Sequence, residues 1–205
     1  MARLLAAEVA DFLQDSVDRT GAAAFMAAGG RTPVATYAFL RKMPINWSDI
    51  SVTLTDQECV DPASPQKDER GLREFLLRDA AASARWVPLR SSTAPSSGDE
   101  IVLLGMGVDG HVASLFPGHP SLESGLKLNG GRRFVEVPAS AAGPAQPQIS
   151  VALDAIAAAR RVILVTTGAE KRRTLERAME GSDVLELPVR AVLRHAASLI
   201  VAWAP

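Results

Sequence analysis

The segment 101–118, IVLLGMGVDGHVASLFPG, constrains the fold and chemistry of this chain more than any other. Four consecutive apolar residues, Ile101 to Leu104, predict a short buried strand. Glycines follow at 105, 107 and 110, where a backbone turns tightly or approaches a ligand closely. The same turn carries a carboxylate, Asp109, and an imidazole, His111. A strand that runs into such a turn predicts an active-site loop.

The glycine spacing also matches G-x-G-x-x-G, the fingerprint of a dinucleotide-binding turn. That fingerprint opens a long helix whose N-terminus holds the pyrophosphate. Here Pro117 and Gly118 would stop a helix after little more than one turn, because proline removes a donor and clashes inside a helix. The bulky side chain of His111 directly after the third glycine also disfavours this interpretation. A dinucleotide site is therefore the weaker of the two hypotheses.

Strand-like and helix-like segments alternate along the chain. Strands are expected at 22–28, 51–55, 101–104, 149–153, 161–167 and 199–204, with an edge strand at 134–137. Helices are expected before Gly21 and at 33–42, 69–81 and 168–179, with loops at 56–58, 61–65 and 91–98. This order predicts an α/β fold, a mostly parallel doubly wound sheet with helices on both faces, in one domain spanning residues 1–205.

Composition narrows the possible partners and the compartment. Twenty-two basic and 23 acidic residues give a net charge of −1, which argues against binding to nucleic acid or to a membrane surface. The one cysteine, Cys59, cannot form an internal disulfide; we expect it to be a small buried apolar residue in a reducing cytosol. No signal-peptide core and no apolar run of about 20 residues is present. We therefore expect a cytoplasmic protein, whose oligomeric state stays open, a monomer included.

Four loops follow expected strands directly: GGRT, TDQE, GMGVDGH and TGAEK. Ligands of parallel sheets bind beyond the carboxyl ends of the strands, so we expect these loops to gather on one rim. Gly29, Gly30, Arg31 and Thr32 lead into a helix N-terminus, with Thr32 as its N-cap and Pro33 as its first residue. Such an end attracts anions.

Two cations on this rim are candidates for binding a phosphate. Arg31 lies in the first loop, and Lys171 opens the helix after the last of the four loops. Taken singly, each side chain could equally extend into solvent. Together with the bare glycine backbone they predict a phosphate clamp.

His111 is the best candidate for a general base, because imidazole titrates near neutral pH. Asp109 is close enough in sequence to orient it. The alternative is a core histidine bonded to the backbone. His119 is expected in a loop and His195 at a helix end. No metal-ligand spacing and no G-x-S-x-G elbow is present, so water is the expected nucleophile and neither metal nor cofactor is expected.

The segments GGRTPVATYAFL, WSDISVTLTD, LLGMGVDGHVASLFPG and VILVTTGAEKRRTL resemble the 6-phosphogluconolactonase family, from about residue 20 to the C-terminus. The resemblance implies an α/β fold shared with sugar-phosphate isomerases. It also implies cofactor-free hydrolysis of the δ-ester of 6-phosphogluconolactone, in the pentose phosphate pathway. His111 is then the general base, assisted by Asp109. The expected substrate-binding residues are Gly29, Gly30, Arg31, Thr32, Asp56, Gly107 and Lys171.

Several positions depart from the family pattern. Lactonases usually read D-E-R where this chain has Asp56-Gln57-Glu58, and an arginine where it has Gln148. The family's Ser-Asn pair is replaced by Lys67-Asp68, and Arg31 stands where the family commonly has a serine. A helical segment of the family is missing between Leu77 and Asp99. Related deaminases have a glutamate at the position of Phe116. A weak or silent sugar-phosphate-binding protein, a shifted substrate, and an isomerase or deaminase therefore remain as alternatives.

Overall fold

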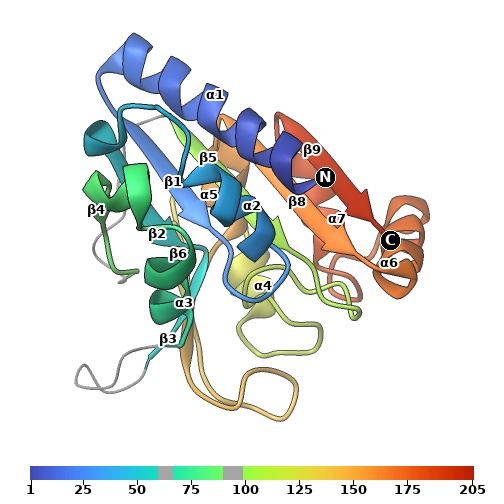
Figure 1. Cartoon of the computed structure of the whole chain (residues 1–205). Helices are drawn as coiled ribbons and strands as arrows, with labels where there is room; N and C mark the ends of the chain where they lie inside the picture. Colours follow the sequence, from blue (N-terminus) through green and yellow to red (C-terminus); the bar gives the residue numbers. More distant parts are fainter. Residues whose placement is uncertain (60–66, 90–98) are drawn as a thin grey trace.

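A six-stranded parallel sheet forms the centre of the computed structural model, which describes residues 1–59, 67–89 and 99–205 (Figure 1). Its strand order is β4-β2-β1-β5-β8-β9, and every neighbouring pair is parallel. The strands are β1 (Ala23–Ala27), β2 (Ile50–Leu54), β4 (Arg85–Trp86), β5 (Glu100–Gly105), β8 (Arg161–Thr167) and β9 (Leu199–Ala204). This sheet confirms the predicted α/β class.

Helices cover both faces of the sheet because its strands are apolar on both sides. In β5, Ile101 and Leu103 join one core, while Val102 and Leu104 join the other. The first core includes α1 (Ala2–Thr20) and α2 (Val34–Leu40), and the second includes α5 (Leu153–Ala158), α6 (Ala169–Glu180) and α7 (Val189–His195). Two further helices are α3 (Lys67–Phe75) and α4 (Leu122–Leu126), and short 3-10 turns span Trp47–Asp49 and Asp79–Ser83.

A second, antiparallel sheet has the order β3-β7-β6, with β3 (Asp56–Glu58), β7 (Gln148–Val151) and β6 (Phe134–Val137). The expected turn at 56–58 is therefore wrong: this polar segment is a strand, because β7 supplies hydrogen-bonding partners. Buried Gln57 is satisfied there, since its Oε1 accepts from the Leu89 N–H at 2.9 Å. The prediction of an edge strand at 134–137 is confirmed.

Short elements account for the other differences from the sequence prediction. Strand β4 and helices α4 and α5 were not predicted, and of α7 only a helix end at His195 was expected. The expected helix 69–81 ends at Phe75. Helix α2 begins at Val34, one residue later than expected, and Pro33 is its N-cap, so the assignment of Thr32 as N-cap was wrong. Helices this short are fixed by tertiary packing, not by their own periodicity. The loops expected at 61–65 and 91–98 lie outside the described residues. None of the described helices combines the length and apolarity that crossing a bilayer requires.

The strand order reverses between β1 and β5. From β1 the chain proceeds to β2 and β4 on one side, whereas from β5 it proceeds to β8 and β9 on the other. The loops that leave β1 and β5 therefore separate and open a crevice at the carboxyl edge of the sheet. Such a switch point is where doubly wound sheets bind ligands.

Candidate functional site

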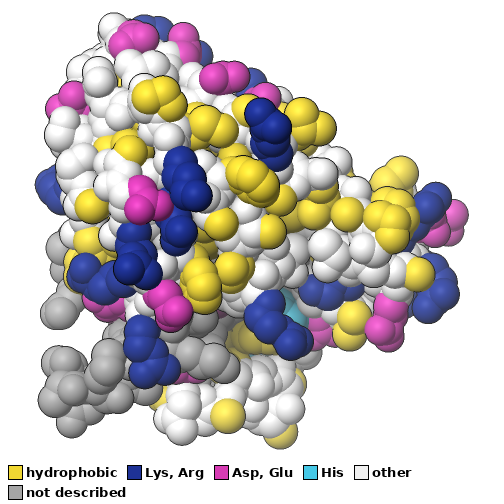
Figure 2. All heavy atoms as spheres, viewed as in Figure 1, with side chains coloured by type: hydrophobic (Ala, Val, Ile, Leu, Met, Phe, Trp, Pro, Cys, Tyr) yellow, Lys and Arg dark blue, Asp and Glu magenta, His cyan; other side chains and the backbone are white. Residues whose placement is uncertain are grey.

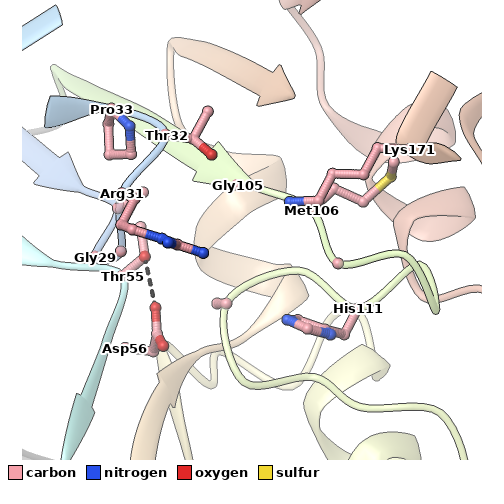
Figure 3. Close-up of a pocket in the computed structure, with 14 residues that line it drawn as sticks. Gly29, Arg31, Thr32, Pro33, Thr55, Asp56, Gly105, Met106, His111 and Lys171 are labelled. Carbon is pink, nitrogen blue, oxygen red and sulfur yellow. Dashed lines mark hydrogen bonds between the residues drawn. The ribbon is translucent and has the colours of Figure 1, made fainter. Parts of the chain in front are cut away.

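A cavity of about 400 Å³ occupies the switch point (Figure 3). Its walls are the segments that follow β1, β2, β5 and β8, as the sequence predicted for the four loops. Eight of the nine predicted site residues line it: Gly29, Gly30, Arg31, Thr32, Asp56, Gly107, His111 and Lys171. Asp109 does not line the cavity but is hydrogen-bonded to the His111 side chain.

His111 and Asp109 form a hydrogen-bonded pair. The distance from His111 Nδ1 to Asp109 Oδ1 is 2.6 Å, and the same oxygen accepts from the His111 backbone N–H at 3.2 Å. Because a carboxylate only accepts, Nδ1 must carry the hydrogen. Nε2 is then left with a lone pair, as a general base requires. The imidazole also packs on the Phe116 ring, with centroids 4.5 Å apart, so it is held on two sides.

The loop that carries this pair is held by neighbouring helices. Thr174 of α6 donates from Oγ1 to the Val108 carbonyl at 2.8 Å. The Val189 N–H at the start of α7 donates to the Gly110 carbonyl at 2.9 Å. Strand β5 leads into this loop, and the next described helix begins only at Leu122. The glycines therefore do not open a helix, which removes the structural basis for a dinucleotide site.

Position 107 requires glycine because the side chains of His111 and Asp109 lie against its backbone. A Cβ at Gly107 would lie 2.3 Å from His111 Nδ1 and 2.4 Å from Asp109 Oδ1. Both distances are far below van der Waals contact. The imidazole and the carboxylate occupy the space that any side chain at 107 would need.

Asp56 lies on the opposite side of the cavity from His111, at the start of β3 (Figure 3). Its Oδ1 accepts from Thr55 Oγ1 at 2.9 Å and its Oδ2 from Ser114 Oγ at 3.1 Å. Buried Ser114 also contacts the Gln148 amide. The Ser114 hydroxyl has one hydrogen, and the Asp56 carboxylate can only accept it. Ser114 therefore donates to Asp56, and the Gln148 amide must donate an N–H to the Ser114 oxygen. Sequence reasoning missed Ser114, although it follows His111 within the motif.

Arg31 and Lys171 enter the cavity from opposite sides (Figure 3). The Arg31 guanidinium points across the cavity toward the loop of Gly105 to His111, although the side chain remains exposed. Lys171 projects from the first turn of α6, on the same side as His111. Figure 2 shows the corresponding hollow, where a basic side chain and a histidine lie side by side. The cavity therefore presents positive charge to a ligand from two directions.

The two family positions at which basic residues are expected lie together on the small sheet. Glu58 is half-buried and pairs with Gln148 across β3 and β7, and neither side chain lines the cavity. Nearby Cys59 is exposed, so its expected burial was wrong. Desolvation by the surrounding protein atoms and, secondarily, the charge of Glu136 raise the pKa of its thiol. The side chains of residues 67 and 68 lie outside the described part of the structure.

The other two histidines occupy the positions expected for them. His119 lies in a loop, buried, with Nε2 at 2.9 Å from the Pro138 carbonyl and Nδ1 at 2.8 Å from Ser121 Oγ. His195 is the exposed last residue of α7. In the described ranges, no three His, Cys, Asp or Glu side chains form a cluster that could hold a metal ion.

Tyr37 of α2 holds the turn after β1, because its buried hydroxyl donates to the Ala28 carbonyl at 2.7 Å. Burial raises the pKa of Tyr37 well above its usual range, so the hydroxyl remains a donor. Tyr37→Phe leaves the Ala28 carbonyl without this bond, and we expect the free energy of unfolding to fall by about 1–3 kcal/mol. A urea titration would show a lower midpoint with an unchanged m-value. An unchanged midpoint would contradict this role for the bond.

The fold and the site define an α/β protein with a histidine–carboxylate pair and a positively charged cavity at its switch point. A family model described as glucosamine-6-phosphate isomerases/6-phosphogluconolactonase matches residues 1–201. The chain therefore belongs to this family.

Individual proteins that are similar to this chain in sequence or structure are 6-phosphogluconolactonases. The chain is 34% identical to a 6-phosphogluconolactonase of Rhizobium meliloti, over 100% of this chain and 94% of the relative. It is 35% identical to a 6-phosphogluconolactonase of Caulobacter vibrioides, over 94% of this chain and 88% of the relative. Among solved structures, a 6-phosphogluconolactonase of Shewanella baltica superposes with a TM-score of 0.88 at 30% identity, covering 100% of this chain and 93% of that one.

Proposed function

We propose that this protein hydrolyses 6-phospho-D-glucono-1,5-lactone to 6-phosphogluconate, in the pentose phosphate pathway. The observation that carries the proposal is the His111 imidazole, which is held by Asp109 and faces a cavity with cations on two sides. The full-length similarity to lactonases supports the same activity. Hydrolysis of an ester needs a base that activates water and a site that binds the phosphorylated sugar, and this cavity supplies both.

His111 acts as the general base through Nε2. It takes a proton from water while the hydroxide oxygen bonds to C1 of the lactone, and the carbonyl becomes an oxyanion. Backbone N–H groups at the rim steady that oxyanion. The intermediate collapses as the bond from C1 to the ring oxygen breaks, and His111 returns the proton to this leaving oxygen. Asp109 stabilises the imidazolium that forms between the two steps and keeps the ring oriented.

The remaining cavity residues bind the substrate. Gly29 and Gly30 allow the sugar phosphate to approach the backbone, and the Thr32 hydroxyl and Arg31 guanidinium donate to phosphate oxygens. Lys171 adds a charge from the other wall. Asp56, held by Thr55 and Ser114, accepts from sugar hydroxyls. Because Gly107 has no side chain, the His111 ring can lie against this loop and face the substrate.

Arg31 offsets the loss of a basic residue at position 58. A guanidinium can hold two phosphate oxygens at once, which a serine cannot do. Charged hydrogen bonds of this kind contribute roughly 1.5–3 kcal/mol, so Arg31→Ser is expected to weaken 6-phosphogluconate binding by about tenfold or more. Calorimetric titration measures this change. Unchanged affinity would mean that Arg31 serves only as an exposed surface residue.

A catalytically silent sugar-phosphate-binding protein is the second candidate, favoured by Glu58 and Gln148 where basic residues are expected. Lactone hydrolysis above the spontaneous rate, measured beside calorimetric binding of 6-phosphogluconate, separates the two functions. Binding without turnover supports the silent protein, whereas turnover at enzymatic rates excludes it. An isomerase or deaminase is disfavoured because Phe116 packs on His111 at the position of the deaminase glutamate.

We further propose that residues 1–205 form a single domain that acts in the cytoplasm. The balanced charge and the single cysteine support this setting.

A further inference from the structure

Two neighbouring helices, α6 and α7, hold the loop of the catalytic pair, one on each side of Asp109. Thr174 of α6 donates to the Val108 carbonyl. The backbone N–H of Val189, at the start of α7, donates to the Gly110 carbonyl. Val108 and Gly110 are the residues that flank Asp109 in the chain. The position of the Asp109 carboxylate therefore depends on how α6 and α7 are placed relative to each other.

The guanidinium of Arg190 joins these two helices. Arg190 lies on α7, and only 5% of its surface is exposed. Its Nη2 donates to the Arg177 carbonyl, in the last turn of α6, at 3.2 Å. Its Nη1 donates to the Asp183 carbonyl at 2.8 Å and also to the Glu186 carboxylate. One side chain thus binds the end of α6 and the connection that leads from α6 to α7.

Gly181 makes room for this guanidinium at the end of α6. A Cβ at position 181 would overlap Nη2 and Cζ of Arg190. The backbone of Gly181 is extended, with φ −96° and ψ 172°, so a residue with a side chain could adopt it. The glycine is therefore explained by the close approach of Arg190 and not by the backbone conformation.

The contacts of Arg190 determine geometry more than stability. The hydrogen bond and the charge of Arg190 lower the pKa of the Glu186 carboxyl, so the pair is ionised at neutral pH. A buried ion pair is often no more stabilising than apolar side chains of the same volume, because charged groups lose their hydration. An arginine differs from an apolar residue in having donors at fixed angles, which here bind carbonyls of two segments.

We propose that Arg190 is a positioning residue for the catalytic pair, because it fixes α7 against α6 and so holds Asp109 within hydrogen-bonding distance of His111. The inference rests on the proposed function, in which His111 is the base. Asp109 must accept from Nδ1 so that Nε2 keeps its lone pair for the attacking water. A displacement of α7 would move Gly110 and disturb this hydrogen bond.

The first test compares Arg190→Lys with Arg133→Lys. Lysine keeps the charge but lacks the planar guanidinium that binds the two carbonyls and the carboxylate together. Arg190→Lys is expected to lower kcat about tenfold and to leave KM within twofold, because the base is displaced while the substrate contacts remain. Arg133 is the matched control, since it pairs with Glu100 at 2.6 Å, at the end of β5 away from the loop. Arg133→Lys is expected to lower the thermal midpoint without changing kcat.

The second test observes the imidazoles directly by ¹H–¹⁵N NMR, which distinguishes a hydrogen on Nδ1 from one on Nε2. His111 is expected to carry its hydrogen on Nδ1 in the wild type and to become a mixture of both forms in Arg190→Lys. His119 is an internal control: the Ser121 N–H donates to its Nδ1 at 3.1 Å, so its hydrogen lies on Nε2. A general loss of stability would not change His111 while His119 stays as it is.

Gly181→Ala tests the same contact without removing the guanidinium. The added methyl group would displace the Arg190 side chain while the backbone remains allowed, so the protein is expected to fold with a lower kcat. Its effect should be smaller when it is added to Arg190→Lys than in the wild type, because both changes act on one contact. If Arg190→Lys does not fold, kcat and the His111 tautomer of Gly181→Ala decide the question.

Three results would overturn the proposal: a wild-type kcat and tautomer in Arg190→Lys, a lower kcat with an unchanged His111 tautomer, or an equal loss of kcat in Arg133→Lys. The outcome is distinguishable from a failure of the proposed function. If the wild-type protein does not hydrolyse the lactone but the His111 tautomer changes in Arg190→Lys, the positioning role stands and the enzymatic function falls. If the wild-type protein hydrolyses the lactone and Arg190→Lys changes neither readout, the function stands and the role of Arg190 falls.

Discussion

His111→Ala is expected to lower kcat/KM for lactone hydrolysis by about 10²–10⁴, the usual contribution of a general base. The imidazole is the group that faces the cavity with a free Nε2, because Asp109 occupies Nδ1. Binding of 6-phosphogluconate should be largely retained, since the side chains proposed to bind the phosphate, Arg31, Thr32 and Lys171, stay in place. The rate is measured against spontaneous hydrolysis of the lactone in the same buffer.

His195→Gln is the matched control, because this second imidazole is exposed at the end of α7, away from the cavity. It should hydrolyse the lactone at the wild-type rate. Equal rates for His111→Ala and wild type would exclude His111 as the base, whatever the affinity for the product.

Gly107→Ala is expected to lower kcat about 10²-fold while the protein stays folded. The added Cβ would overlap the His111 ring and the Asp109 carboxylate, so both must move. Displacing a catalytic group by about 1 Å can cost about 10²-fold in rate. Both side chains are partly exposed and can shift into solvent, so the free energy of unfolding should change little.

Gly130→Ala controls for the general effect of adding a methyl group to a loop glycine. Among the described residues its Cβ would meet Asp154 Oδ2, at 3.7 Å, and Gly130 does not line the cavity. This variant should keep the wild-type kcat. A Gly107→Ala protein with normal kcat would show that the observed distance between His111 and Asp109 is not needed for turnover.

The sequence determined the main sheet and the chemistry of its edge. Apolar runs such as Ile101 to Leu104 can only be buried, and strands buried on both faces form a parallel sheet covered by helices. Glycines and polar residues placed directly after these strands had to meet at the carboxyl edge. His111, Asp56, Arg31 and Lys171 could therefore be predicted as neighbours although they come from four separate segments.

Only the tertiary structure determined those elements whose hydrogen-bonding or packing partners lie far away in the sequence. Residues 56–58 are polar and short, and they become a strand only because β7 lies alongside. The five- to seven-residue helices α4, α5 and α7 are too short to be stable alone, so their own sequence carries little signal. Buried Arg190 reaches the end of α6 only because α7 packs against that helix. Local periodicity determines which residues must be buried, whereas the juxtaposition of distant segments depends on packing that no local pattern records.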